Sequence, residues 1–302
     1  MDTQTAPRED QAIDEATGGM IVGIDGSPTS LAALRWAAAA PAEWGQIVPF
    51  AAWRMPLWQS VLAGSTAAVV WAELEHAADR GIDHVIEQLS DAERDRLAER
   101  VVVEGDTVAA LTAEADAFDL LVVGTRGRGA VADTLLGSVS VDCVGRATTP
   151  VAVVPEDVDL DGDGPVVVGI DGSPNSAAAV RWALENTAEG VPIVAVGAWT
   201  FVIHGTLDSP PIMDDLTEDD TRRLVEGVVE RVCAEVGRSP DDVEIDIRRT
   251  DPRVALDAAS KDARMLVLGA RGVHGWAFAL LGSVTTAMVH QPRVPTVVVP
   301  AD

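Results

Sequence analysis

Short apolar runs alternate with stretches of helical periodicity along almost the whole chain. In the first half the apolar runs predict strands over residues 20–25, 47–53, 101–103, 120–123 and 151–154. The helical spacing of apolar positions between them predicts helices over residues 30–40, 66–89, 107–115 and 138–146. Short apolar strands that alternate with helices are typical of parallel βαβ units, whose helices cover both faces of the sheet. The pattern therefore predicts a doubly wound, Rossmann-like α/β domain with a five-stranded parallel sheet.

The second half of the chain repeats the first half in the same order. The segment Asp25-Gly26-Ser27-Pro28 recurs as Asp171-Gly172-Ser173-Pro174. The glycine-rich stretch 124–138, GTRGRGAVADTLLGS, recurs at 269–283 as GARGVHGWAFALLGS. Such self-similarity indicates two copies of one domain in tandem.

The segments outside the two copies are polar. Residues 1–19 have little apolar content and no periodicity, which predicts a disordered acidic tail. We expect the domains at residues 20–155 and 165–300, joined by an acidic linker at 156–164. The linker begins like a calcium-binding loop, but Val168 stands where such a loop requires a glutamate, so a solvated linker is the better interpretation.

Composition narrows the classes of function. The formal net charge of −26, with Lys261 as the single lysine, argues against nucleic acid as the main partner, because few cations are available to neutralise phosphates. The two cysteines, Cys143 and Cys233, have no metal-like spacing and are expected as thiols in a reducing compartment. The start of the chain is acidic and no apolar run is long enough to span a membrane, so we expect a cytoplasmic protein without a membrane partner.

Two conspicuous segments of each copy lie at the carboxyl ends of predicted strands. Asp25 ends the predicted first strand, and Gly124 directly follows the predicted fourth strand. In an open parallel sheet, ligands bind outside the carboxyl ends of the strands, where neighbouring connections leave in opposite directions. If the first and fourth strands are neighbours, Asp25 and the glycine-rich stretch lie in one crevice.

The glycine-rich stretch has the residue types of a phosphate site. Gly124 and Gly127 can adopt backbone angles closed to other residues and let an anion approach main-chain N–H groups. Gly137 and Ser138 begin a helix, whose N-terminus attracts anions. In the simpler interpretation these glycines only turn the chain and Ser138 only caps the helix. Recurrence of all four positions in the second copy favours the phosphate site.

The pattern Gly-x-x-Gly, nine residues, Gly-Ser, together with the early Val-Gly-Ile-Asp-Gly-Ser segment, resembles the ATP-binding branch of the universal stress protein family in its tandem form. The resemblance extends from Met20 to Pro300. It implies one ATP per domain, with magnesium as an accompanying ion, and a stress-response or regulatory role with little or slow hydrolysis. It also implies that the apolar edge strands 151–154 and 296–299 pair with each other as a pseudo-dimer. Whether two such chains associate further is left open, as is the identity of a regulatory protein partner.

The resemblance assigns a role to individual residues. Asp25 and Asp171 are expected near the ribose-phosphate and any magnesium, and the adenine is expected near the main chain of Ala52 and Ala198. Residues expected around the triphosphate and ribose are Gly124, Gly127, Gly137, Ser138 and Ser140 in the first copy, and Gly269, Gly272, Gly282, Ser283 and Thr285 in the second.

The two loops differ in charge. An acidic protein that binds a polyanion must concentrate its cations locally, and Arg126 and Arg128 lie inside the first glycine-rich stretch. Arg271 corresponds to Arg126, whereas Val273 replaces Arg128. We therefore expect both sites to bind, the first more tightly.

Tryptophans recur at two positions in each copy. Trp36 and Trp182 follow helical apolar spacing and are expected in the core. Trp53 and Trp199 end the predicted second strands, where core packing is favoured over stacking on adenine.

Three classes of function remain: a nucleotide-binding regulatory protein, an ATP-splitting enzyme, and an interaction module that has lost the nucleotide. The sequence lacks a Ser-Gly-Gly-x-Asp loop, a His-x-Gly-His pair and a P-loop lysine, and no nucleophile arrangement is evident. These features argue against an enzyme. The intact glycine loops argue against the pure interaction module.

Overall fold

A computed structural model shows how these predicted elements assemble. It describes residues 18–55, 67–127, 137–200, 202–204, 212–214, 217–271 and 281–301, with main chain alone for residues 67–68, 202–204 and 212–214. Residues 1–17 of the predicted tail and the predicted contacts of Arg128 and Gly272 lie outside these residues. Gly19, also assigned to the tail, is bonded to the domain, since its carbonyl accepts from the Asp119 N–H at 3.0 Å.

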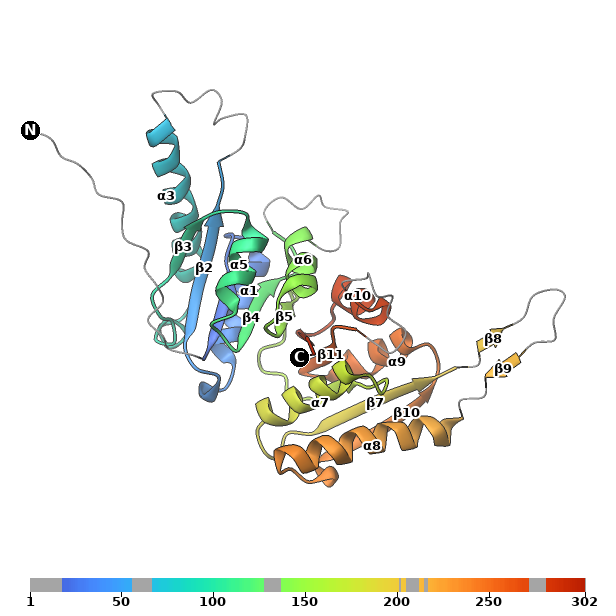
Figure 1. The fold of residues 1–302 in the computed structure, drawn as a ribbon. Coiled ribbons are helices and arrows are strands. Elements are labelled where there is room, and N and C mark those ends of the chain that lie inside the picture. Colours follow the sequence, from blue (N-terminus) through green and yellow to red (C-terminus); the bar gives the residue numbers. More distant parts are fainter. Residues whose placement is uncertain are drawn as a thin grey trace, which may run out of the picture.

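The elements of each half follow the predicted order (Figure 1). In the first half they are β1 (Met20–Gly23), α1 (Pro28–Ala39), η1 (Ala42–Trp44), β2 (Ile47–Trp53), α3 (Ala67–Ile86), α4 (Asp91–Arg94), β3 (Val101–Glu104), α5 (Thr107–Ala115), β4 (Leu120–Gly124), α6 (Ser138–Arg146) and β5 (Val151–Val154). In the second half they are β6 (Val166–Gly169), α7 (Pro174–Asn186), β7 (Ile193–Trp199), β8 (Val202–His204), β9 (Ile212–Asp214), α8 (Glu218–Val236), η3 (Pro240–Asp242), β10 (Val243–Arg249), α9 (Pro252–Ala259), η4 (Ser260–Asp262), β11 (Met265–Gly269), α10 (Ser283–His290) and β12 (Thr296–Val299).

All described strands except β8 and β9 form one ten-stranded sheet with the order β10-β7-β6-β11-β12-β5-β4-β1-β2-β3. Within each half the strands are parallel, and β1 lies between β2 and β4 as β6 lies between β7 and β11. The halves join where β12 pairs with β5 in antiparallel orientation, with Val297 opposite Ala152. The prediction that the two edge strands pair as a pseudo-dimer is therefore confirmed, as is the doubly wound five-stranded domain.

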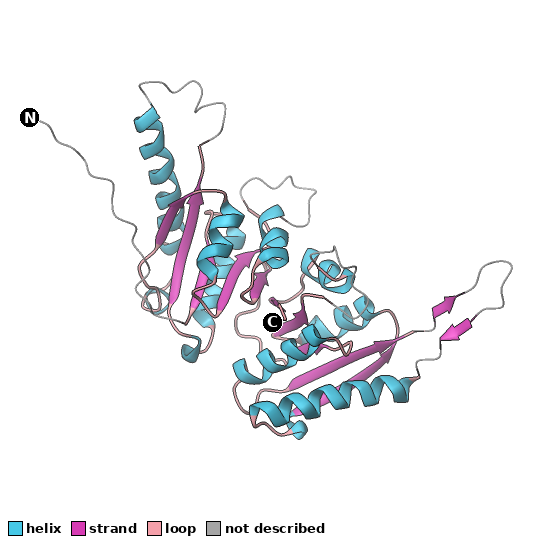
Figure 2. Cartoon of the chain, viewed as in Figure 1, coloured by secondary structure: helices cyan, strands magenta, loops and turns pink. Residues whose placement is uncertain are grey.

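Helices cover both faces of the sheet (Figure 2). The apolar cluster under α1, α3, α7 and α8 is continuous across both halves, and Ala152 of β5 and Val297 of β12 are both part of it. On the opposite face, α5 and α6 pack over the first half, where Val298 of β12 joins their cluster. Helices α9 and α10 cover the second half on that face. The two halves thus share their core on both sides of the β5–β12 junction.

Helices α1 and α7 begin in the same way, because the Ser-Pro pair that precedes each is suited to a helix start. The Ser27 hydroxyl accepts a hydrogen bond from the Ser30 N–H at 3.2 Å, and Ser173 does the same for Ser176 at 3.1 Å. Proline occupies the first helical position in both, where no N–H is needed. This start fixes the chain that leaves β1 and β6.

Three indole rings connect the halves. The Trp44 ring lies edge-on between Trp36 and Trp182, with centroid distances of 5.8 and 5.5 Å. The Trp44 Nε1–H donates to the Asn186 carbonyl at 3.3 Å. Trp182 is buried and Trp36 packs half-buried against the core, in line with the prediction for both.

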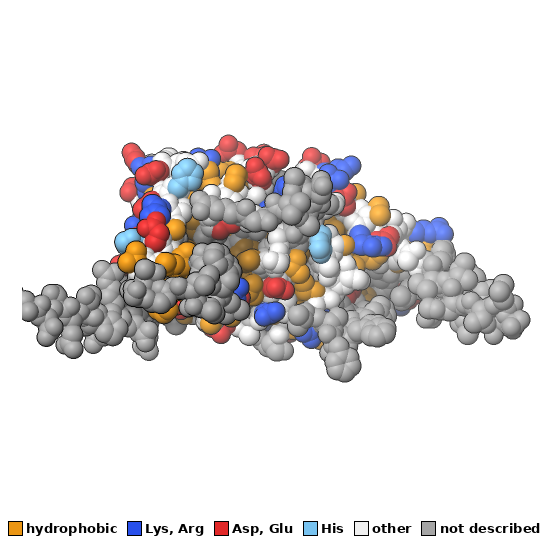
Figure 3. All heavy atoms as spheres, turned by 90° about the horizontal axis from the view of Figure 1, so that it is seen from above, with side chains coloured by type: hydrophobic (Ala, Val, Ile, Leu, Met, Phe, Trp, Pro, Cys, Tyr) orange, Lys and Arg blue, Asp and Glu red, His pale blue; other side chains and the backbone are white. Residues whose placement is uncertain are grey.

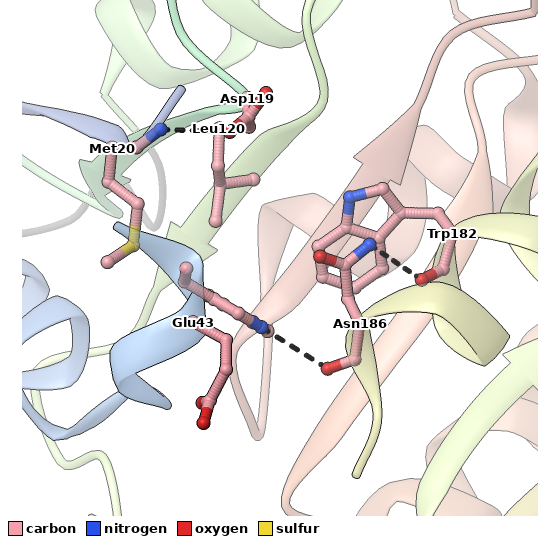
Figure 4. A pocket seen from close by; sticks show the side chains of 8 residues that line it. Met20, Glu43, Asp119, Leu120, Trp182 and Asn186 are labelled. Carbon is pink, nitrogen blue, oxygen red and sulfur yellow. Dashed lines mark hydrogen bonds between the residues drawn. The ribbon is translucent and has the colours of Figure 1, made fainter. Parts of the chain in front are cut away.

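A pocket of about 80 Å³ beside Trp44 and Trp182 lies at the amino ends of β1 and β4, away from the predicted site (Figure 4). Two acidic residues, Glu43 and Asp119, are among those that line it. In Figure 4 the Glu43 carboxylate points away from the Trp182 ring, and the Asp119 Oδ2 accepts a hydrogen bond from the Gly19 N–H at 2.8 Å. The two carboxylates therefore do not converge on one ligand position.

Some short elements were not predicted. Strands β8 and β9 form a separate antiparallel pair after β7, and the short helix α4 begins at a capping box between Ser90 and Glu93. In the part of the chain that the structure describes, no helix is both long and apolar enough to cross a membrane.

Candidate functional site

A tight turn places Asp25 at the carboxyl end of β1. The Ile24 N–H continues the ladder by donating to the Phe50 carbonyl at 2.7 Å. Gly26 then has a φ of 77°, a left-handed conformation that favours glycine, and the Asp25 Oδ1 accepts from the Ser27 N–H at 3.0 Å.

The second half repeats this turn in detail. Gly172 has a φ of 81°, and the Asp171 Oδ1 accepts from the Ser173 N–H at 3.0 Å. Both aspartates are therefore held at the start of a helix, at the end of the strand next to the glycine loop.

The first glycine of the loop is required by packing rather than by its backbone angles. A Cβ at Gly124 would lie 2.6 Å from the Thr29 carbonyl oxygen, and a Cβ at Gly269 would lie 2.6 Å from the Asn175 carbonyl carbon. The positive φ angles of this region are at Gly26 and Gly172, not at Gly124 or Gly127. The expectation that Gly124 and Gly127 adopt angles closed to other residues is therefore wrong, because the special conformation lies on the aspartate turn.

The glycine loop of the first half is fixed to the start of α1. The Thr29 hydroxyl donates to the Arg126 carbonyl, and the Ser27 hydroxyl reaches the same oxygen at 3.4 Å. A Cβ at Gly127 would lie 2.6 Å from the Asp25 Oδ2. The structure thus brings Asp25 and the glycine loop together, as the crevice prediction requires.

The corresponding contact in the second half is similar but not identical. There the Ser173 hydroxyl donates to the Arg271 carbonyl at 3.3 Å. Asn175 stands where the first half has Thr29, and its Oδ1 accepts from the Ala301 N–H at 3.0 Å. The second loop is therefore fixed by a hydroxyl at the same position, while its neighbour binds the end of the chain.

The helices that follow the loops begin without a side-chain cap. Gly137 and Gly282 occupy the cap positions of α6 and α10, and neither start has a side-chain cap hydrogen bond. The helices α1, α5, α7 and α9 all have one. Ser138 and Ser283, the first helical residues, are exposed. An uncapped helix N-terminus offers N–H donors and a partial positive charge to an anion.

Main-chain bonds close both loops. The Gly137 N–H donates to the Thr125 carbonyl at 2.8 Å, and the Gly282 N–H donates to the Ala270 carbonyl at 2.9 Å. The start of each helix is therefore held beside the end of β4 or β11, next to the aspartate turn.

Two predicted phosphate ligands are buried behind the loops. The Ser140 hydroxyl lies 3.0 Å from the Gly137 carbonyl and 3.3 Å from the Thr125 carbonyl. The Thr285 hydroxyl donates to the Gly269 carbonyl at 2.7 Å. Both hydroxyls fasten the helix to the strand, and their contact with phosphate stays a prediction.

Ala52 and Ala198 lie one residue before the ends of β2 and β7, next to β1 and β6 in the sheet. The tryptophans that follow them are half-buried at the sheet end. The Trp53 ring contacts the Trp71 ring at a centroid distance of 6.2 Å, and the Arg249 guanidinium lies 5.2 Å from the Trp199 ring centroid. Both indoles therefore pack at the sheet end rather than deep in the core, which the sequence did not indicate.

The side chain of Arg126 is exposed and lines a hollow of about 430 Å³ between the two halves. Arg293 and His290 of the second half line the same hollow, as does Asp257, whose pKa is lowered by its hydrogen bond to Arg293. Arg126 thus faces the junction of the halves as well as bordering the loop.

Metal-ligand groups and thiols would be alternative sources of chemistry at the described part of the crevices. Among the residues that the structure describes, no three His, Cys, Asp or Glu side chains group to hold a metal ion. Burial raises the pKa of the Cys143 thiol in α6 to about 12, so this group stays protonated and unreactive at neutral pH.

The sequence profile of the universal stress protein family matches the chain twice, at residues 19–155 and 164–300. The chain belongs to this family. A universal stress protein of Mycobacterium tuberculosis is 33% identical over 303 residues, which cover 93% of this chain and 94% of that protein. This relative is therefore matched over nearly its whole length, across both halves of the present chain.

A solved structure of the family agrees with this chain in fold. A universal stress protein from Archaeoglobus fulgidus has a TM-score of 0.66 at 19% identity, and covers 95% of this chain and all of its own. A universal stress protein described in complex with cAMP is 32% identical, covers 45% of this chain and 96% of its own, and has a TM-score of 0.34.

Proposed function

We propose that this universal stress protein is a regulatory protein that binds one nucleotide in each half, with ATP as the expected ligand and little or slow hydrolysis. The observation that carries the proposal is the contact between Asp25 and Gly127, beside the uncapped start of α6. It brings a carboxylate and main-chain donors to the edge of β1 and β4, where an open parallel sheet binds ligands.

The charge of the protein supports binding through the main chain. At a net charge of −26, a polyanion is held best where N–H groups rather than side chains supply the positive potential. The loop and the start of α6 offer such groups close to β4. Viewed toward the carboxyl ends of the first-half strands, acidic side chains gather along one edge and apolar groups lie nearer the middle (Figure 3).

Asp25 fits a role with magnesium. A carboxylate beside a phosphate loop would repel phosphate unless a cation lies between them. Mg²⁺ is commonly held by one or two carboxylates together with substrate phosphates and water, so the absence of a metal cluster among the described residues does not conflict with this role. Asp25 and Asp171 would each hold the ion against the nucleotide. Because the Asp25 Oδ1 already accepts from the Ser27 N–H, we expect an anchoring role and not that of a general base.

The proposal is tested on the full chain purified without added nucleotide. Denaturation followed by mass spectrometry should release adenine nucleotide, and calorimetry of the emptied protein should show two sites for Mg-ATP. ADP and cAMP serve as ligands with shorter phosphate chains. An emptied protein that ignores all three would favour the interaction module, and rapid turnover with a second substrate would favour an enzyme.

The cellular location and the output of nucleotide binding are also part of the proposal. Two thiols that are buried and unpaired are consistent with a reducing cytoplasm. A change of conformation or of protein partner on nucleotide binding is the expected output, in keeping with a stress-response role.

A further inference from the structure

A buried pair of hydroxyls holds one peptide of the first glycine loop. The Thr29 hydroxyl donates to the Arg126 carbonyl, and the Ser27 hydroxyl lies 3.4 Å from the same oxygen. The two hydroxyls are 3.1 Å apart, and Thr29 is only 2% exposed. The carbonyl of an exposed loop residue is therefore fixed at the start of α1, 97 residues earlier in the chain.

This bond also sets the direction of the next main-chain donor. The Arg126 carbonyl and the Gly127 N–H belong to one planar trans peptide, in which the two groups point in opposite directions. Because the carbonyl points to the start of α1, the Gly127 N–H points away from it. No described residue accepts a hydrogen bond from this N–H.

The Gly127 N–H lies beside the uncapped start of α6. A Cβ built at Gly137, the cap residue of α6, would lie 3.6 Å from the Gly127 nitrogen and 3.4 Å from the Arg126 Cα. The donors of the first turn of α6 and the Gly127 N–H therefore belong to one anion-binding edge.

The reversed orientation of this peptide is open to the chain. A flip changes ψ of Arg126 and φ of Gly127, and glycine accepts φ of either sign. Gly127 has no positive φ in the structure. In the flipped state the Arg126 carbonyl would face the anion-binding edge and would repel a phosphate. The bonds at this carbonyl therefore decide whether the loop presents a donor or an acceptor.

The second half has no threonine at this position. The Ser173 hydroxyl donates to the Arg271 carbonyl at 3.3 Å, as the repeat requires. Asn175 replaces Thr29, and its Oδ1 accepts from the Ala301 N–H at 3.0 Å. The threonine hydroxyl is therefore a feature of the first loop and not of the repeat.

From this arrangement we infer that Thr29 is a positioning residue of the first nucleotide site: its hydroxyl holds the 126–127 peptide with the Gly127 N–H toward the phosphate chain of the ligand. Thr29 acts through the loop, because its own side chain is buried against the Arg126 carbonyl. The inference rests on the proposed function, since it assigns how one phosphate donor of that site is oriented. It adds a second difference between the two sites to the difference in loop charge.

The experiment uses Thr29→Val, which keeps the shape of the side chain and removes the hydroxyl. Calorimetry on the full chain measures the affinities for Mg-ATP and for adenosine. The first site should lose about tenfold or more in ATP affinity, because a hydrogen bond to a charged group is weakened. Adenosine has no phosphate, so its affinity should not change. The second site of the same molecule should keep its ATP affinity.

Two variants serve as matched controls. Thr29→Ser keeps the hydroxyl and should retain the ATP affinity of the first site. Asn175→Ala changes the corresponding position, whose described bond is to Ala301, and should leave the ATP affinity of both sites unchanged. If thermal unfolding shows that Thr29→Val does not fold, Thr29→Ala replaces it, because alanine places no methyl group against the Arg126 carbonyl.

The outcomes separate the inference from the function on which it rests. Unchanged ATP affinity in a folded Thr29 variant without the hydroxyl would overturn the inference and leave the proposed function standing. Equal losses of ATP and adenosine affinity would also overturn it, because a residue that only stabilises the domain affects both ligands alike. An unmodified chain that binds no ATP would overturn both.

Discussion

The two glycines that open the first loop should respond in opposite ways to the same substitution. At Gly124 an added Cβ meets the main chain and Cβ of Thr29 at 2.6–2.8 Å, so α1 must shift. Overpacking of this kind costs about 1–3 kcal/mol of unfolding free energy, or roughly 2–12 °C in Tm for a domain of this size. Gly124→Ala should therefore destabilise the first half.

Among the described residues, the added Cβ at Gly127 meets the Asp25 carboxylate, at 2.6 Å from Oδ2, and no main-chain atom. Gly127 has no positive φ, so alanine also gains about 0.4–1 kcal/mol from the less flexible unfolded chain. Gly127→Ala should leave Tm within about 4 °C of the parent. It should lower ATP affinity by about tenfold or more, because it displaces a charged group from the site.

The assay is thermal unfolding and ATP calorimetry on both variants, with Gly269→Ala as the matched control. A Cβ at Gly269 meets the Asn175 main chain at 2.6 Å, so this variant should lose stability as Gly124→Ala does. The reasoning is refuted if Gly127→Ala loses as much stability as Gly124→Ala while ATP affinity is unchanged. The glycine loop would then serve the packing of the domain and not the binding of ATP.

Three further predictions follow from the described contacts. Trp44→Ala removes two edge-on ring contacts of about 0.5–1.5 kcal/mol each, so the halves should unfold in two separate calorimetric transitions where the parent shows one; a single transition would contradict this. The Cys143 thiol titrates near 8.5 when unfolded and near 12 when folded, so its contribution to stability is complete below pH 8.5. That contribution should decline by at most about 1.4 kcal/mol per pH unit above this value, and urea unfolding of Cys143→Ala should show a shallower decline between pH 9 and 11. Since β5 and β12 already pair within the chain, sedimentation should give a monomer near 31.6 kDa, and a stable dimer at micromolar concentration would count against this.

The sequence was sufficient for the strands of the ten-stranded sheet and for the main helices that cover it. The predicted boundaries of β2, α5, α6 and β5 coincide with those of the structure. Each is bounded by a strong local signal: Pro150 and Pro155 enclose β5, and Asp106 caps α5. The second half of the chain repeats the same order of apolar runs and helical stretches, which supported the predicted elements independently.

What the sequence could not predict depends on contacts between distant segments. The clash that makes Gly124 necessary arises from α1, almost a hundred residues earlier, and no local pattern reports it. Trp44 has Gly190 as its counterpart, so the repeat comparison gave no indication that this ring lies at the junction. The pairing of Arg249 with Trp199 required the β7–β10 register.

The candidate site was predicted in part. Asp25 and the glycine loop could be expected together because strand order in doubly wound sheets is restricted. The backbone roles of the glycines could not be distinguished from sequence, because both close approach and a positive φ call for the same residue type.

The antiparallel pairing of β5 with β12 has a consequence for how this molecule can change. In a dimer of identical chains joined through such an edge, every substitution appears on both sides of the two-fold axis. Here both partners belong to one polypeptide, and each can vary alone. Glu104, opposite Trp53 at the end of β3, and Arg249, opposite Trp199 at the end of β10, therefore differ in charge at matching positions. Covalent linkage allows the two halves to diverge in this way while their shared core keeps them in one folded unit.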